Sequence, residues 1–186
     1  MTVTVFEDRP ETARGRWLYQ ALLATHAHIR DHLASVDRLA EAVLDGLPTN
    51  ELQAELEALK ANTTLWQFQV SCLRYCGLVH MHHNAEDTMF FDELEQTNPA
   101  ISPVIERLRA DHRAVSDYID TVETGTRALK DDDSQAARRA VANALQALNE
   151  HLLAHLDYEE RNVERTARRL RDFSSEGIRL ESGSYG

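Results

Sequence analysis

The sequence predicts an all-α protein folded as an up-down-up-down four-helix bundle. Only 7 of the 186 residues are Gly and 4 are Pro, while the helix-favouring residues Ala, Leu, Glu, Arg and Gln are abundant. Apolar residues recur every three or four positions in four long segments, which is the period of an amphipathic helix. Short turn signals separate these segments, and four helices with short connections pack most simply as such a bundle.

A turn at Gly46 and Pro48 divides the first half of the chain into two helices. The first helix is expected over about residues 11–45, because a Gly after a helix and a Pro shortly beyond it end the helical pattern. The second helix is expected over about residues 50–96, with Thr49 or Asn50 as its cap.

Two pairs that place Pro after a capping residue mark the start of the third helix. Asn98-Pro99 and Ser102-Pro103 each combine a cap with Pro at the first helical position, so this helix is expected to begin there and to fade by Gly125. Caps and negative charge between residues 131 and 134 introduce a fourth helix over about residues 134–172.

The length of the chain fits a single domain with a sizeable core. Residues 1–12 are expected to form an N-terminal extension and residues 13–172 the four-helix bundle. Residues 173–186, rich in Ser and Gly, are expected to form a disordered tail.

Charge and hydropathy exclude several classes of partner. With 20 basic and 31 acidic residues the formal net charge is -11, which would repel phosphate backbones, so no nucleic-acid partner is expected. The N-terminus lacks the pattern of a signal peptide, and no stretch approaches the roughly 20 apolar residues of a transmembrane helix. Two cysteines provide no disulfide framework. We therefore expect a cytoplasmic protein without a membrane partner, and the oligomeric state stays open.

Nine histidines fall into four groups, one on each expected helix. The groups are His26, His28 and His32; His80, His82 and His83; His112; and His151 and His155. Each apolar stripe contains one histidine, and two stripes contain a glutamate four residues later. The residues expected to point inward are His26, His82, Glu86, His112, His155 and Glu159. His83 is expected off the stripe, since it follows His82 by roughly 100° of helix rotation.

Two glutamates among four core histidines indicate a metal site. Burying an ionised carboxylate without a partner costs several kcal/mol, and no Lys or Arg lies nearby in the same stripes. A network of protonated His and Glu is the structural alternative, but metal cations use imidazole and carboxylate as ligands. Residues four apart share a helix face, so His82/Glu86 and His155/Glu159 can each reach one centre. Six such ligands suit two irons better than a structural zinc or a magnesium ion.

The order of these residues resembles the hemerythrin-like (HHE cation-binding) family. The pattern His, His-x-x-x-Glu, His, His-x-x-x-Glu spans roughly residues 14–170, and its most telling stretches are 25–30, 82–91 and 155–160. The resemblance implies a non-heme, oxo- or hydroxo-bridged pair of iron ions. It also implies small ligands: dioxygen, peroxide or nitric oxide. Glu86 and Glu159 would bridge, with the four histidines as terminal ligands.

The third helix departs from the pattern of oxygen-carrying hemerythrins, which are expected to have a second histidine four residues from the first. Here Leu108 and Ser116 stand at that spacing from His112. The resemblance therefore implies an open position near His112, taken by water or by a substitute. His151 and Tyr118 are candidate substitutes, and Glu160 is an alternative to Glu159 as the carboxylate of the fourth helix.

Several functions stay open at this point. One is a binding or sensing protein for dioxygen or nitric oxide. Another is a di-iron enzyme, either catalase- or peroxidase-like or an oxygen-activating oxidase, and a third is an iron-buffering protein. The Glu-x-x-His pairs of ferritin-like di-iron oxidases are absent. The aromatic residues Trp17, Trp66, Tyr75, Phe90 and Phe91 are expected to pack in the core.

Overall fold

The computed structural model describes residue 6, residues 9–44 and residues 72–172 of the chain. Every regular element in these ranges is helical, which confirms the all-α prediction. Residues 72–85 form a helical segment that continues into the next two elements. The elements are α1 (Ala13–Leu44), the π-helix η2 (Glu86–Phe90), α3 (Phe91–Thr97), the 3-10 helix η3 (Pro99–Ile101), α4 (Ser102–Ala128) and α5 (Gln135–Ala167).

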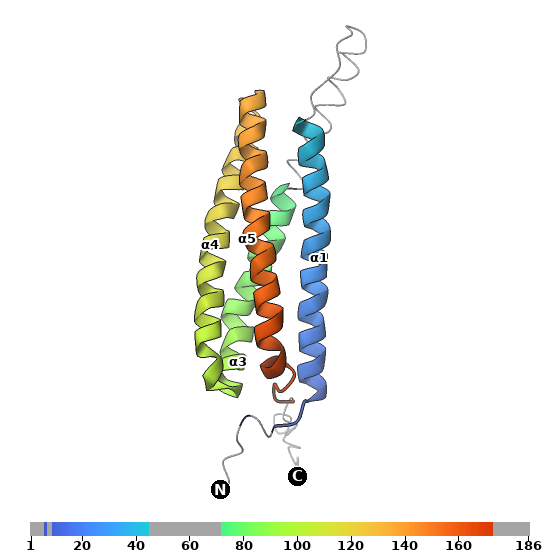
Figure 1. The fold of residues 1–186 in the computed structure, drawn as a ribbon, viewed down its shortest axis with the longest axis vertical. Coiled ribbons are helices and arrows are strands. Elements are labelled where there is room, and N and C mark those ends of the chain that lie inside the picture. Colours follow the sequence, from blue (N-terminus) through green and yellow to red (C-terminus); the bar gives the residue numbers. More distant parts are fainter. Residues whose placement is uncertain (1–5, 7–8, 45–71, 173–186) are drawn as a thin grey trace, which may run out of the picture.

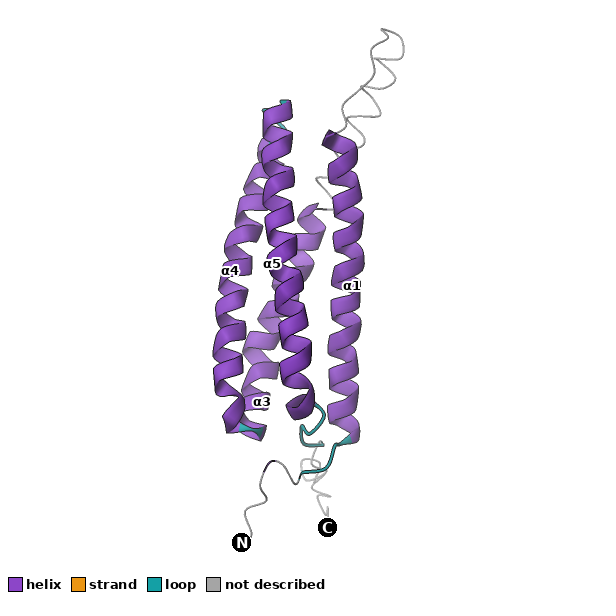
Figure 2. Cartoon of the chain, in the orientation of Figure 1, coloured by secondary structure: helices purple, strands orange, loops and turns teal. Residues whose placement is uncertain are grey.

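The helices lie side by side with alternating direction (Figure 1). In that view α1 runs upward, residues 72–97 run downward, α4 runs upward and α5 returns downward. Figure 2 shows the same arrangement with loops only at the ends of the bundle among the described residues. The expected turn at Gly46 and Pro48, the start of the second helix and the tail at 173–186 lie outside the described residues.

Two of the predicted caps, at Asn98 and Ser134, are present. Ser102 is not a cap, because it is the first residue of α4 and the N-cap of that helix, Ile101, makes no side-chain hydrogen bond. The side chain of Asn98 accepts a hydrogen bond from the Ala100 N–H (3.3 Å) before η3. The side chain of Ser134 accepts one from the Ala137 N–H (3.2 Å) and begins α5. Both caps satisfy N–H groups that have no partner within the first helical turn.

Two helix ends differ from the prediction, and close packing explains both. Helix α4 continues past Gly125 to Ala128, and a Cβ at Gly125 would lie 2.9 Å from Cγ2 of Val141. This Gly therefore allows close approach to α5 instead of ending its own helix. Helix α5 ends at Ala167, short of the predicted residue 172. The next carbonyl, of Arg168, accepts a hydrogen bond from the Thr12 N–H (2.9 Å), which ties the two chain ends together.

A polar layer separates two hydrophobic clusters along the bundle. One cluster contains Ile29, Val79, Val115 and Leu152, and the other contains Leu22, Phe91, Leu108 and Val163. On each helix the candidate ligands lie between a residue of the first cluster and a residue of the second. The apolar residues on both sides exclude water from the polar layer and raise the cost of any uncompensated charge within it.

The aromatic residues divide between core and surface. Tyr75 and Phe91 are fully buried, as predicted. The expectation for Trp17 is wrong, because its side chain is 67% exposed on the outer face of α1, one residue before Leu18 of the apolar stripe. Trp66 lies outside the described residues. None of the described helices is both long and apolar enough to cross a membrane.

Candidate metal centre

The six residues that the sequence places inward lie together in the polar layer. Each is buried, with no more than 8% of its surface exposed. Helix α1 contributes one of them, the segment 72–90 two, α4 one and α5 two. They are His26, His82, Glu86, His112, His155 and Glu159.

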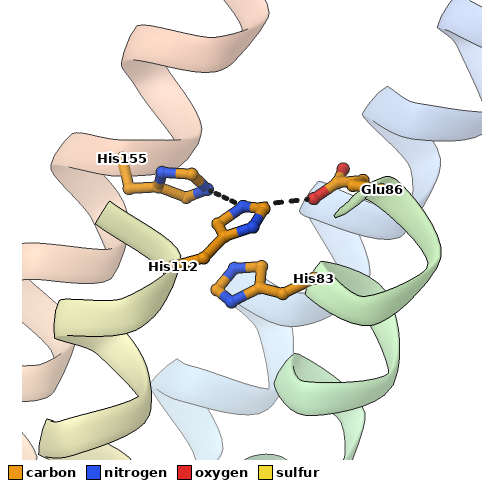
Figure 3. Close-up of side chains that lie close together, drawn as sticks. All are labelled: His83, Glu86, His112 and His155. Carbon is orange, nitrogen blue, oxygen red and sulfur yellow. Dashed lines mark hydrogen bonds and ion pairs between the residues drawn. The ribbon is translucent and has the colours of Figure 1, made fainter. Parts of the chain in front are cut away.

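These residues form two overlapping groups of possible metal ligands. In each group, one nitrogen or oxygen atom per residue lies within 4.8 Å of the others. We call the group of His26, His82, Glu86 and Glu159 the α1-side set. The α4-side set consists of His83, Glu86, His112 and His155 and is drawn in Figure 3. Glu86 belongs to both sets, so its carboxylate lies at their boundary.

The carboxylate of Glu86 faces both sets, one oxygen to each. Its Oε1 lies 3.2 Å from Nε2 of His82, and its Oε2 lies 3.5 Å from Nε2 of His112. Ligand atoms that bind one ion at roughly 2.1 Å stand about 3–4 Å apart, so both spacings suit binding to a shared cation. The position of Glu86 therefore allows its carboxylate to contact a cation on either side, and its metal ligation stays a prediction.

Glu159 lies between the same two sets. Its Oε2 is 3.4 Å from Nε2 of His26 and 3.8 Å from Nε2 of His155. The neighbouring Glu160, the alternative from the sequence, belongs to neither set. The geometry therefore favours Glu159 over Glu160 as the second bridging carboxylate, and its metal ligation stays a prediction.

The imidazoles converge in pairs through their Nε2 atoms. Those of His26 and His82 are 2.9 Å apart, and those of His112 and His155 are 3.2 Å apart. Burial lowers the pKa of His82 to about 3. It also lowers the pKa of His112, to about 2, with nearby imidazoles adding to the shift. These rings are therefore neutral at physiological pH, which is the form that binds a metal.

The strongest sign of a cation is the condition of the two glutamates. All four of their carboxylate oxygens are buried and have no hydrogen-bond partner among the described residues. In the same part of the chain, only histidines lie within ion-pairing distance of these oxygens. Burial and the charge of Glu159 raise the pKa of Glu86 well above its usual value. An uncompensated pair of buried carboxylates would cost several kcal/mol, which a bound cation removes.

The pKa of His26 reflects the same excess of negative charge. Burial opposes its protonation, but the adjacent carboxylates of Glu159 and Glu86 outweigh burial and raise the pKa of His26 to about 10. A proton on His26 thus offsets part of the charge when no metal is bound. Metal binding to Nε2 would displace this proton, since the ligand must be deprotonated.

A local change in helix geometry positions Glu86. The residues Glu86–Phe90 form a π-helix, and the Phe91 N–H donates to the Glu86 carbonyl five residues earlier. The wider turn rotates the following residues, so that Phe91 is fully buried whereas Phe90, the stripe residue at ideal helical spacing, is only half-buried. Such π turns occur often at functional sites.

The sequence interpretation of His83 is wrong. This side chain is only 6% exposed, and its ring stacks on that of His112, with centroids 3.9 Å apart and an angle of 10° between the planes. His82 points to the α1-side set and His83 to the α4-side set, so a centre wide enough for two ions accepts both. An ideal helix has one inward face, so helical spacing alone predicted that only His82 points inward. The absent second histidine on the third helix was a signal to look for another imidazole beside His112, and metal ligation by His83 stays a prediction.

Carboxylates face the outer nitrogen atoms of three of the imidazoles. Oε1 of Glu160 lies 2.8 Å from Nδ1 of His26. An oxygen of Asp87 lies 3.1 Å from Nδ1 of His112, and one of Asp111 lies 3.8 Å from Nδ1 of His155. Among these three contacts only that of Glu160 with His26 is a hydrogen bond. A carboxylate hydrogen-bonded in this position fixes the tautomer and orientation of a metal-binding imidazole.

The other two candidate substitutes, Tyr118 and His151, contact each other through their rings, with centroids 5.4 Å apart. His151 belongs to neither set. His83 instead lies beside His112, where we expected an open position. The α4-side set therefore contains three imidazoles and the α1-side set two.

Each side of the centre borders a pocket of different character. A pocket of about 320 Å³, the apolar pocket, reaches His82 and Glu86 between walls that include Leu22 and Phe90. A second pocket of about 230 Å³, the polar pocket, reaches His83 and His112, and polar residues such as Asn84 and Arg113 line it.

Comparison with known protein families agrees with this geometry. The sequence pattern of the hemerythrin HHE cation-binding domain matches residues 17–167. The chain belongs to the hemerythrin HHE cation-binding family. The match covers all four site-bearing segments, so the HHE domain of this chain includes both candidate ligand sets. Searches among curated proteins and among solved structures found no match.

Proposed function

We propose that this HHE domain holds two iron ions and binds or reacts with dioxygen, peroxide or nitric oxide. The observation that carries the proposal is the position of Glu86 between two sets of imidazoles, buried and without a hydrogen-bond partner among the residues that the structure describes. A carboxylate shared between two groups of nitrogen and oxygen donors suits a pair of iron ions better than one structural zinc.

Each residue of the centre has a distinct part in this proposal. Glu86 and Glu159 would bridge the two ions through their buried carboxylates. His26 and His82 would hold the ion of the α1 side, and the remaining three imidazoles the ion of the α4 side. A bound iron pair would supply electron transfer and vacant coordination positions for small ligands.

The surrounding residues orient the imidazoles and keep water out. With its proton on Nδ1, His26 donates to Glu160 and presents the Nε2 lone pair to the ion. The hydrophobic clusters on both sides of the polar layer exclude bulk water from the centre. An excluded-water site strengthens the attraction between its carboxylates and a cation.

Catalysis on peroxide is the second candidate function. The observation that favours it is the apolar pocket, which leads from the surface to His82 and Glu86 and so provides a path for a reactant. Iron buffering has less support. The ligands are at most 8% exposed, and buried ligands predict slow exchange with external chelators.

The first test is the metal content of the purified chain together with its near-ultraviolet absorption spectrum. We expect about two irons per chain, as the two ligand sets require, and the absorption of a bridged ferric pair. Titrations with peroxide and with nitric oxide would then separate an enzyme from a sensor. One zinc per chain, or no metal at all, would contradict the proposal and leave the inward residues as a structural polar network.

A further inference from the structure

The apolar pocket is built by two adjacent helical segments. Leu18, Ala21 and Leu22 of α1 form one wall, and Met89 and Phe90 of η2 form the opposite wall. At its inner end the pocket reaches His82 and Glu86, two residues of the α1-side set. An occupant of this pocket therefore touches the candidate metal centre at one end and apolar side chains along its length.

The charged groups of the apolar pocket compensate each other. The guanidinium of Arg14 donates to both carboxylate oxygens of Glu93, at 2.9 Å for Oε2, and also to the Arg171 carbonyl (2.9 Å). The hydroxyl of Thr25 donates to the Ala21 carbonyl of its own helix (3.1 Å). Apart from the residues of the metal centre, the pocket thus offers no uncompensated charge, and an uncharged occupant suits it.

The volume of the pocket is too large for a diatomic molecule alone. At about 320 Å³ it lies at the lower end of small-molecule sites, which span roughly 300–1,000 Å³. A water molecule takes a share of about 30 Å³, so hydrogen peroxide or dioxygen would fill only a small part of the space. A molecule with an apolar body would displace the remaining water from the walls, which is favourable.

We propose that the apolar pocket binds an organic hydroperoxide, with its apolar body between α1 and η2 and its O–O group at His82 and Glu86. This inference rests on the proposed function, and it names the class of peroxide. A ferrous pair held at the centre would supply two electrons, one per ion, and with two protons taken up the O–O bond of the hydroperoxide would break. The products are the alcohol, which keeps the apolar body, and one water molecule.

The polar pocket on the other side does not suit such a molecule. His80, Asn84 and Arg113 line it, together with His83 and His112 of the α4-side set. An apolar body placed there would remove polar groups from water without providing hydrogen bonds in return. The organic part of the substrate is therefore assigned to the α1 side alone.

Methionine methyl groups report directly on occupancy of the apolar pocket. The chain has three methionines, and Met89 lines the pocket whereas Met81 does not. Both side chains are exposed, at 67% and 66%, so they form a matched pair of probe and internal control. The full chain, ¹³C-labelled at its methionine methyl groups and loaded with zinc to keep the signals sharp, is titrated with 2-phenylpropan-2-ol. This alcohol is the product expected from cumene hydroperoxide.

We expect a saturable shift of the Met89 signal and no shift of the Met81 signal. Ala21→Phe fills the pocket from α1 and should abolish the shift. Ala34→Phe, at an exposed position of the same helix outside the pocket, should leave the shift unchanged. Ala85→Phe repeats the test from the facing wall if Ala21→Phe does not fold by circular dichroism. A Met89 signal that stays still, or that moves equally in the pocket-filling variants, overturns the proposal.

Single-turnover oxidation of the ferrous chain separates this proposal from the proposed function. Ala21→Phe should slow oxidation by cumene hydroperoxide at least about tenfold and change oxidation by hydrogen peroxide less than about threefold, because a pocket narrowed at Ala21 still admits the smaller molecule. If the ferrous chain reacts with hydrogen peroxide but does not bind the alcohol, the pocket proposal is wrong and the proposed function is unaffected. Binding of the alcohol without reaction of either peroxide contradicts the peroxide part of the proposed function and supports the pocket as a binding site.

Discussion

The two sides of the candidate centre share their carboxylates but differ in everything around them. The α4 side has three imidazoles and borders the polar pocket, while the α1 side has two imidazoles and borders the apolar pocket. If Glu86 and Glu159 both bridge, the protein supplies five ligands to one ion and four to the other. For six-coordinate iron, the α1 side keeps more positions for an external ligand, and these lie next to the apolar pocket.

This difference shows that two adjacent residues of one helical segment can face opposite sides of a site and make those sides unequal. His82 and His83 follow each other in the chain, yet one faces α1 and the other faces α4. The added imidazole fills the α4 side, where we expected an open position beside His112. If the proposed function holds, the open coordination positions would lie on the α1 side, opposite to the place that the sequence indicated.

Removal of Glu86 should have the largest effect, because this residue belongs to both sides. We predict that Glu86→Ala lowers the iron content from about two per chain to less than about 0.5, since both ions lose a ligand and the centre loses a negative charge. The measurement is iron per chain by elemental analysis. Glu106→Ala removes an exposed carboxylate of α4 as the control and should keep full iron. If Glu86→Ala retained about two irons per chain, Glu86 would not be a ligand shared by the two sides.

Substitution of one imidazole should separate the two sides. We predict that His82→Ala and His83→Ala each leave about one iron per chain, because each removes a ligand from one set only. Only His82→Ala should abolish binding of an external ligand such as nitric oxide, since it empties the side with the open positions. His80→Ala changes an exposed histidine of the same segment and should retain both irons. Two irons in His83→Ala would show that the α4 side does not use this imidazole.

The fold was predictable because its signals are local. Apolar spacing gave four helices, and the caps at Asn98 and Ser134 lie where the sequence placed them. The inward residues were predictable for an energetic reason, since a glutamate in a core stripe needs a cation. Both predictions depend only on residues that are close in the chain and on the rotation per residue of an ideal helix.

The rest of the site depends on features that an ideal helix does not have. The π turn at Glu86–Phe90 shifts the inward face by one residue, which moves Phe91 into the core and leaves Phe90 at the pocket. His83 points inward because the centre is wide, and its width follows from the distances between helices. The pockets likewise form between side chains from different elements, whose relative positions no spacing rule determines.

Loss of a carboxylate that faces the outer nitrogen of a ligand imidazole should weaken iron binding less than loss of the imidazole itself. The effect should be confined to the side of the centre on which that imidazole lies. We predict that Glu160→Gln weakens iron binding on the α1 side about 10–100-fold, because Glu160 is hydrogen-bonded to a ligand imidazole. Asp87→Asn should weaken binding on the α4 side to a smaller extent, because its carboxylate faces His112 at 3.1 Å without a hydrogen bond. The measurement is iron retention against a competing chelator. In the background of His82→Ala, which lacks the α1-side ion, Glu160→Gln should add nothing while Asp87→Asn still acts. Equal effects of both changes in that background would contradict the assignment to sides.

The smallest predicted effect lies one step farther from the centre, at Arg30. Its guanidinium donates to Glu160 (2.7 Å) and to Asp157 (2.9 Å), and so holds the carboxylate that orients His26. Burial opposes ionisation of Glu160, but Arg30 and His26 outweigh it and lower the pKa of this carboxyl. Because Arg30 is partly exposed, its ion pairs are worth at most about 1 kcal/mol.

We therefore predict that Arg30→Gln weakens iron binding on the α1 side by no more than about fivefold, measured with the same chelator. Arg109→Gln is the matched control, because Arg109 has the same 31% exposure and pairs with Asp87 and Asp92 near the α4 side. If Arg30→Gln weakened binding more than Glu160→Gln does, Arg30 would have to act on the centre by a route other than Glu160. If iron binding instead weakens only slightly and only on the α1 side, the difference between the two sides extends to the surface of the bundle.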